Sequence, residues 1–240
     1  MRAGAIIVAG GMGKRMNAGT PKQLIELSGR TILEWTFEPF IACPEVAELV
    51  VVSEPGILAR LEELVEPFRA SGKPIAVVPG GRERQDSVAC GLAVLSRECG
   101  IAAIHDAVRP FVTAGQIAAC IHAGGKFGAA TLMVPVRDTV KRVRDGIVEA
   151  TIDRADLWVT QTPQAFRREI IEQAHEQAAR DRFIGSDDCV LVERLGIEVH
   201  AVEGSGYNIK ITTPDDLAIA EALLAVLKKG GRHAGHRPRI

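Results

Sequence analysis

The 240-residue sequence predicts an α/β fold in which a mostly parallel sheet carries helices on both faces and a β-hairpin arm projects from it. Two observations lead to this prediction. Short apolar runs alternate along the chain with longer segments of helical period, and one charged stretch past the middle breaks that alternation. Strands joined by helices run parallel, and both faces of such a sheet have to be covered.

Buried strands are expected at short apolar runs, most of them bounded by Gly or Pro. These runs are residues 5–9, 48–53, 75–78, 101–105 and 129–134. A further short strand is expected over residues 208–212. It carries Lys210 between apolar neighbours, where the ammonium either reaches out to solvent or binds a phosphate.

Helices are expected between these runs, where apolar residues recur at steps of three and four. Such segments are residues 58–68, 87–95 and 116–123. Two further helix starts have capping sequences. Thr31 and Glu34 have the spacing of a capping box, and Thr213 precedes a proline and two acidic residues in a first turn.

The stretch that breaks the alternation covers residues 136–159, where Val or Ile alternates with charged residues around Asp145-Gly146. This dipeptide is favoured in tight hairpins. Because an isolated hairpin is only marginally stable, we expect the arm to pack on a partner chain and form a homodimer. An edge hairpin folded back on its own domain is the alternative.

Composition limits the remaining possibilities. The chain has 29 basic and 30 acidic residues, so bulk charge does not favour nucleic acid as a partner. The apolar run at the N-terminus is too short for a membrane span or a secretion signal, and the five scattered cysteines are expected to be reduced, so we expect a cytoplasmic protein. We expect one domain over residues 1–228 and a basic tail over 229–240, either disordered or a functional basic arm.

A glycine-rich segment, residues 9–16, directly follows the first expected strand. Glycines let backbone amides approach a phosphate closely, and Lys14, Arg15 and Lys22 follow at once, so we expect a polyphosphate site. A plain structural turn is the alternative. The segment is not a Walker A loop, because Arg15 follows Lys14 where Ser or Thr is required.

Two more polar clusters follow expected strands, where ligands of open α/β sheets bind. Residues 79–87 contain a second glycine turn, and residues 105–110 contain Asp106 and Arg109, which we expect to contact substrate or a metal ion. His105 is either a core histidine or a site residue. No spacing supports a metal site held by the protein, and the remaining histidines singled out are expected on the surface or in the tail: His175, His233 and His236.

Seven motifs resemble the 2-C-methyl-D-erythritol 4-phosphate cytidylyltransferase family, which acts in non-mevalonate isoprenoid synthesis. They occur in the family's order over about residues 4–227. The motifs are AGGMGKRM (9–16), PKQ (21–23), GGRERQDSV (80–88), HDAVRP (105–110), PVRDTVKR (135–142), LWVTQTPQAF (157–166) and NIKITTPDDL (208–217).

The resemblance implies a Rossmann-like nucleotidyltransferase domain, CTP and a sugar-alcohol phosphate as substrates, Mg²⁺ held mainly by the CTP phosphates, and a homodimer built by the arm. The residues that would hold CTP are Ala9, Gly10, Gly11, Gly81, Arg82, Ser87 and Lys210. The residues that would act in catalysis are Arg15, Lys22, Arg154 and Lys210, of which Arg15 and Lys22 would stabilise the transition state. The residues that would bind the sugar phosphate are Asp106, Arg109, Thr139, Arg154 and Thr162, with Thr139 and Arg154 reaching the partner's site.

The sequence departs from the family's pattern in two places. The family often has Ala where this chain has Gly10, and an acid is common at the position of Arg82. Ribitol-5-phosphate cytidylyltransferases share several of these motifs, but the arm, with Asp153-Arg154, resembles the methylerythritol enzyme. A nucleotide-binding regulator without catalysis is a third possibility.

Overall fold

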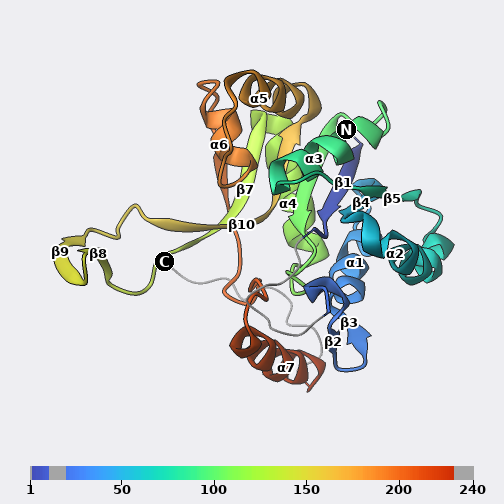
Figure 1. The fold of residues 1–240 in the computed structure, drawn as a ribbon, viewed down its shortest axis with the longest axis horizontal. Coiled ribbons are helices and arrows are strands. Elements are labelled where there is room, and N and C mark those ends of the chain that lie inside the picture. Colours follow the sequence, from blue (N-terminus) through green and yellow to red (C-terminus); the bar gives the residue numbers. More distant parts are fainter. Residues whose placement is uncertain (1, 11–19, 230–240) are drawn as a thin grey trace.

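The computed structural model describes residues 2–10 and 20–229, and its centre is a seven-stranded sheet (Figure 1). The strands of this sheet are β1 (Ala3–Val8), β4 (Val46–Ser53), β5 (Ile75–Pro79), β6 (Ile101–Asp106), β7 (Ala129–Pro135), β10 (Trp158–Arg167) and β11 (His200–Glu203). Their order is β11-β7-β10-β6-β1-β4-β5. Only β10 runs antiparallel to its neighbours, so the predicted mostly parallel sheet is confirmed.

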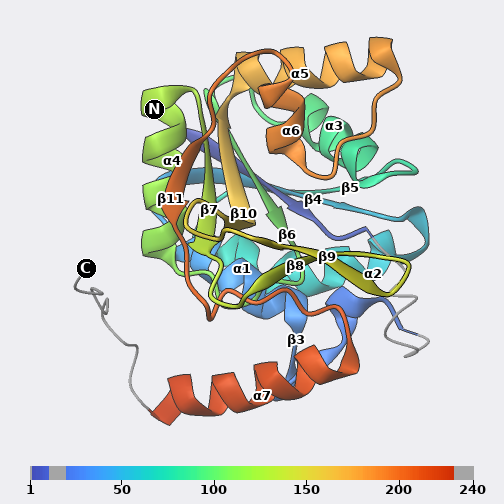
Figure 2. The same ribbon diagram turned by 90° about the vertical axis from the view of Figure 1, so that its left-hand side faces the viewer.

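Helices cover both faces of the sheet, as predicted (Figure 2). They are α1 (Ile32–Ala42), α2 (Leu58–Val65), α3 (Arg84–Val94), α4 (Ala114–Phe127), α5 (Arg168–Asp181), α6 (Asp188–Glu193) and α7 (Pro214–Lys229). Side chains of α1, α2 and α4 form one core with the sheet, and those of α3, α5 and α6 form the other. Successive β1 residues divide between the two, since Ile7 belongs to the first core and Ile6 to the second.

Helix α7 lies apart from the sheet, against a small hairpin made of β2 (Glu26–Leu27) and β3 (Arg30–Thr31). Single-turn 3₁₀ helices at Lys22–Leu24 and Pro55–Ile57, and a longer one at Glu66–Ser71, complete the elements. The last of these replaces the end of the helix predicted over 58–68. Residues 230–240, most of the predicted tail, lie outside the described residues, and Lys229 ends α7.

Both predicted helix starts are confirmed. Thr31 Oγ1 accepts a hydrogen bond from the Glu34 N–H at 3.2 Å, and Glu34 Oε2 accepts one from the Thr31 N–H at 2.7 Å. At the start of α7, Thr213 Oγ1 accepts from the Asp216 N–H at 3.3 Å, while Asp216 accepts in return from the Thr213 N–H at 2.8 Å. Each capping pair satisfies backbone donors that the first turn of a helix leaves unpaired.

The arm is the hairpin of β8 (Val140–Arg144) and β9 (Ile147–Ile152), which stands away from the sheet in Figure 1. Its turn is Asp145-Gly146, with φ of 50° and 79°, the left-handed conformation that this dipeptide favours. The predicted range of 136–159 is too long at its end, because Trp158 and Val159 pair with β7 as part of β10.

The strand predicted over residues 208–212 is wrong. This segment is irregular, and it is tied down by separate contacts rather than by a ladder. Asn208 Nδ2 donates to the Thr162 carbonyl at 2.9 Å, and the Ile211 N–H donates to the Val108 carbonyl at 2.9 Å. The five cysteines are unpaired and four are buried, as expected. None of the helices in the described ranges has the length and apolar character that crossing a membrane requires.

Helix α4 lies close against β10 at Gly124. A Cβ there would lie 2.6 Å from the Ala165 carbonyl oxygen, so Gly124→Ala must push the helix off the sheet. We expect this change to lower the free energy of unfolding by about 1–3 kcal/mol in urea denaturation. Gly125→Ala is the matched control, because its Cβ would meet nothing closer than Ile101 Cδ1 at 3.7 Å. It should gain about 0.5–1 kcal/mol from helix propensity. Equal stability of the two variants would contradict the close contact.

Candidate functional site

A pocket of about 140 Å³ opens where β1 and β6 end. Val8 and Asp106, the last residues of these parallel neighbours, pair with each other and both line the pocket. Ligands of open α/β sheets bind at such carboxyl ends, where the loops diverge. The cationic side chains among the described lining residues are Lys22, Arg84 and Lys210.

Asp106 is the centre of the charge arrangement in this pocket. Its carboxylate lies 2.8 Å from Lys210 Nζ, 3.3 Å from Arg84 Nε and 3.5 Å from Arg109 Nε. The carboxylate is only 10% exposed, and it is reached by Lys210 from the irregular segment and by Arg84 from the first turn of α3. The structure therefore brings together Asp106, Arg109 and Lys210, three residues that the sequence analysis selected.

These charges shift the protonation equilibria of the site. Burial by itself would raise the pKa of Asp106, but the charges of Lys210 and Arg84 outweigh burial and hold that pKa well below its usual range. Burial by itself lowers the pKa of Arg84, but Asp188 and Asp106 raise it above its ordinary value. Asp106 is thus an anion at any working pH, and it balances only part of the surrounding positive charge.

His105 and Thr162 support Asp106 from inside the core. Thr162 Oγ1 accepts from the Asp106 N–H at 3.1 Å and lies 3.0 Å from His105 Nδ1, while His105 Nε2 lies 3.2 Å from the Arg109 carbonyl oxygen. A carbonyl can only accept, so Nε2 carries a proton. Burial lowers the pKa of His105, so the ring is neutral and Nδ1 accepts from the Thr162 hydroxyl. His105 is therefore a neutral core histidine, which confirms the first of the two alternatives. Thr162 is buried, and its hydroxyl is occupied by these partners instead of lining the pocket.

The described residues of the first glycine segment, Ala9 and Gly10, lie beside the second glycine turn. Ala9 is fixed by its N–H, which donates to the Val52 carbonyl at 2.7 Å, and Gly10 is exposed in the pocket wall. A Cβ on Gly10 would lie 3.8 Å from Ser87 Oγ. That buried hydroxyl accepts from the Gly81 N–H at 3.2 Å, so Ser87 holds the second turn beside Gly10.

Arg82 was predicted from the sequence to bind nucleotide, whereas Arg84 was not. Arg82 is exposed and does not line the pocket, whereas Arg84 does. The signal that points to Arg84 is its place in the first turn of a helix that follows a strand, since such residues face the strand ends. Gly11 and Arg15 lie outside the described residues, so their expected roles stay predictions.

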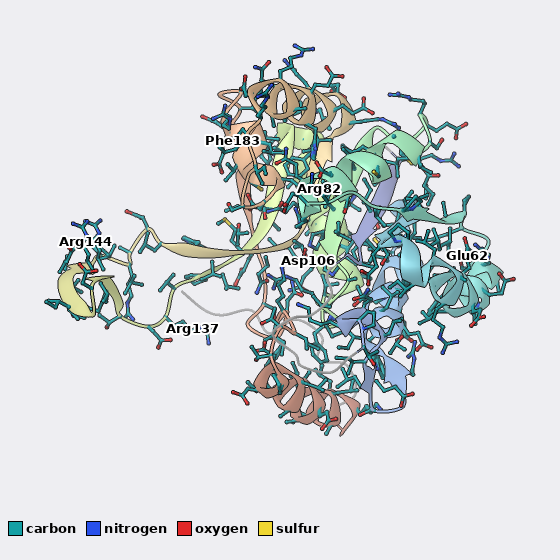
Figure 3. The ribbon with its side chains drawn as sticks, in the orientation of Figure 1. Glu62, Arg82, Asp106, Arg137, Arg144 and Phe183 are labelled. Atoms are coloured by element: carbon teal, nitrogen blue, oxygen red, sulfur yellow. The ribbon has the colours of Figure 1, made fainter. Side chains whose placement is uncertain are left out.

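Thr139 and Arg154 lie on the exposed arm, and Arg154 donates a hydrogen bond to the Arg137 carbonyl. Figure 3 shows Arg137 and the arm standing away from Asp106. These residues do not line the pocket of their own chain.

A protein-held metal centre finds no support in the part of the chain that is described, where no three His, Cys, Asp or Glu side chains gather in a suitable group. Asp106 is the only carboxylate among the described lining residues, and cations already surround it.

The fold and pocket together define a class of protein. Glycine turns at the ends of parallel strands, with lysine and arginine side chains around them, suit the binding of a nucleotide's phosphates and their transfer. The class is the α/β nucleotidyltransferases.

Comparison with known proteins gives the family. The profile of 2-C-methyl-D-erythritol 4-phosphate cytidylyltransferase matches residues 3–226, and the chain belongs to this family of enzymes. The cytidylyltransferase of that name from Halalkalibacterium halodurans is 44% identical over 225 residues, which cover 94% of this chain and 98% of the relative.

Two solved structures are also similar. The 4-diphosphocytidyl-2C-methyl-D-erythritol synthase of Anaerococcus prevotii has a TM-score of 0.82 and 30% identity, covering 93% of this chain and 98% of that one. The 2-C-methyl-D-erythritol 4-phosphate cytidylyltransferase of Thermus thermophilus has a TM-score of 0.78 and 35% identity, covering 94% and 100%. The Rossmann-like fold class is thereby confirmed.

Burial lowers the pKa of His105 to about 4, below the value near 6.5 of an unfolded histidine. Above about pH 6.5 both states are neutral, while between about 6.5 and 4 only the unfolded state takes up the proton. The free energy of unfolding should therefore decrease as the pH is lowered through this window, by up to about 3 kcal/mol. Urea unfolding between pH 7.5 and 4.5 measures the loss. His105→Gln should flatten the curve, and parallel curves for the two proteins would show that His105 is not its source.

Proposed function

We propose that the protein transfers a cytidylyl group from CTP to the phosphate of 2-C-methyl-D-erythritol 4-phosphate, releasing pyrophosphate. The product is 4-diphosphocytidyl-2-C-methyl-D-erythritol. The observation that carries this proposal is that Lys22, Arg84 and Lys210 line one pocket with Asp106 and Gly10, in a chain of the cytidylyltransferase family.

The reaction needs charge neutralisation more than proton transfer. An oxygen of the sugar phosphate attacks the α-phosphorus of CTP, and the bond from that phosphorus to the oxygen bridging to the β-phosphate breaks. A phosphate monoester is largely dianionic at pH 7, because its second pKa is about 6, so no general base is required. The barrier is the approach of this anion to a highly charged triphosphate, which positioned cations lower.

The described residues divide this task. Lys22 and Lys210 enter the pocket from separate segments, so they can neutralise different phosphate groups. Asp106 keeps Lys210 in place through a 2.8 Å ion pair until a phosphate competes for it. Arg15 completes the set in this proposal. Mg²⁺ would enter bound to the CTP phosphates and neutralise part of their charge, since Asp106 is the only carboxylate among the described lining residues.

The arm is proposed to form a homodimer and to complete the partner's pocket with Thr139 and Arg154. Its apolar side chains support this, because Val143, Ile147 and Val148 are 54%, 71% and 58% exposed in the single chain. An isolated hairpin of this kind gains stability by packing on another surface. A cytoplasmic location is proposed because unpaired, mostly buried cysteines suit a reducing compartment.

A turnover assay tests the function. Pyrophosphate release should require CTP, Mg²⁺ and methylerythritol phosphate, and Lys22→Ala should lower kcat by about 100- to 1,000-fold. Lys126→Ala, an exposed lysine on α4, is the matched control and should keep normal turnover. Faster turnover with ribitol 5-phosphate would show that ribitol 5-phosphate is the substrate. CTP binding without turnover on either sugar phosphate would indicate a regulator.

The composite site predicts complementation between inactive variants. Lys22→Ala and Arg154→Ala should each be inactive alone, but a heterodimer has one site with both side chains intact. With random pairing, half of the co-expressed dimers are heterodimers, and each has one active site out of two. The mixture should therefore recover about a quarter of the wild-type activity. No recovery in isolated heterodimers would mean that Arg154 serves its own chain.

A further inference from the structure

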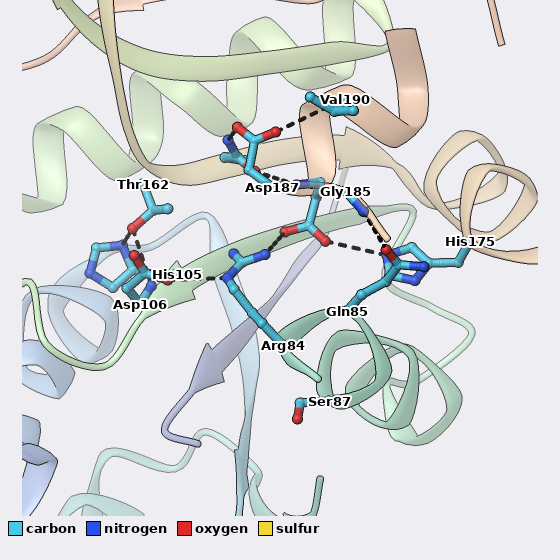
Figure 4. Close-up of polar contacts among 12 residues, drawn as sticks. Arg84, Gln85, Ser87, His105, Asp106, Thr162, His175, Gly185, Asp187 and Val190 are labelled. Atoms are coloured by element: carbon cyan, nitrogen blue, oxygen red, sulfur yellow. Dashed lines mark hydrogen bonds and ion pairs between the residues drawn. The ribbon is translucent and has the colours of Figure 1, made fainter. Parts of the chain in front are cut away.

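A chain of polar contacts leads from Arg84 in the pocket to helices α6 and α5 (Figure 4). Arg84 Nη1 lies 2.7 Å from Asp188 Oδ2, and the other oxygen of Asp188 lies 3.3 Å from His175 Nε2. Asp188 is 1% exposed and His175 is 8% exposed, although the sequence analysis expected His175 on the surface. The three residues come from α3, α6 and α5. Residues 95–167 separate α3 from α5, whereas the short connection 182–187 joins α5 to α6.

Capping of helix α6 does not explain why the Asp188 carboxylate is buried. Its neighbour Asp187 is the N-cap, with Oδ1 accepting from the Val190 N–H at 3.1 Å. A carboxylate is costly to bury unless it is paired, and Arg84 and His175 are the pairing groups here. Asp188 is outside the pocket lining, so it acts on a ligand only through Arg84.

Two carboxylates hold the Arg84 guanidinium from different atoms. Asp106 Oδ1 lies 3.3 Å from Nε, and Asp188 Oδ2 lies 2.7 Å from Nη1. Without Asp188, Arg84 would be drawn onto Asp106, where Lys210 and Arg109 already compete. These two contacts leave further N–H donors of the guanidinium for an anion in the pocket, and the planar fork matches a phosphate.

We propose that Asp188 is a positioning residue that sets the Arg84 guanidinium to bind a phosphate group of a substrate, with His175 fixing the Asp188 carboxylate. The proposal rests on the proposed phosphate-transfer function. The phosphate can belong to CTP or to the sugar phosphate, and Arg84 itself makes the contact.

A double-mutant cycle of Asp188→Asn and Arg84→Met tests this. Asp188→Asn keeps the shape of the side chain and should lower kcat/KM by about 30-fold, mainly through one substrate's KM, because it unpairs a buried charge. In the Arg84→Met background it should change kcat/KM less than twofold. The substrate whose KM rises identifies the phosphate. Glu172→Gln is the matched control, since it unpairs the buried Arg168 (2.7 Å) outside the pocket lining and should leave KM unchanged.

The outcomes separate positioning from a structural role. If Asp188→Asn lowers kcat/KM equally in the wild-type and Arg84→Met backgrounds, the proposal is overturned. A decrease in kcat/KM only when Arg84 is present supports it. If Asp188→Asn does not fold, His175→Phe replaces it in the cycle, with a smaller expected loss that again disappears with Arg84→Met. If the wild type shows no turnover, the proposed function fails. The Kd of inorganic pyrophosphate is then measured by calorimetry for the same four proteins of the cycle. Additive effects on that Kd would overturn the positioning role.

Discussion

A single buried carboxylate organises the pocket. Asp106 attracts Lys210, Arg84 and Arg109 to the end of β6, and without it these cations would repel one another. Its single negative charge does not cancel the charges of these cations, so the pocket keeps a net positive charge. This charge allows two phosphate groups to approach each other there. The attraction is strong because Asp106 is nearly excluded from water.

The fold supports this carboxylate from behind. Thr162 on β10 accepts from the Asp106 N–H, and neutral His105 fixes the Thr162 hydroxyl. Because β10 runs antiparallel between β6 and β7, it places Thr162 beside the end of β6. On the other side, Asp188 holds Arg84 through a second ion pair. The pocket is thus supported by polar side chains that lie outside its lining.

Much of the fold follows from local patterns, and so does part of the site. Apolar runs predicted five strands, and Asp145-Gly146 predicted the arm's turn, because these signals lie within a few neighbouring residues. Lys210 was placed on a strand because its neighbours alternate, but Asn208 is buried by side-chain contacts with distant β10. Arg84 and His175 were missed for the same reason. Asp188 lies 104 positions from Arg84, and it lies on a different helix from His175, so only the folded structure shows that the three are paired.

The most direct measurement is the protonation of Asp106 itself. Carbon-13 NMR of its side-chain carboxyl in the folded protein follows this group alone as the pH is lowered. We expect no titration near the ordinary value of about 3.9, because Lys210 and Arg84 keep the carboxylate ionised. A signal that titrates at the ordinary value would mean that the cations do not converge on Asp106, and the account of the pocket would be wrong.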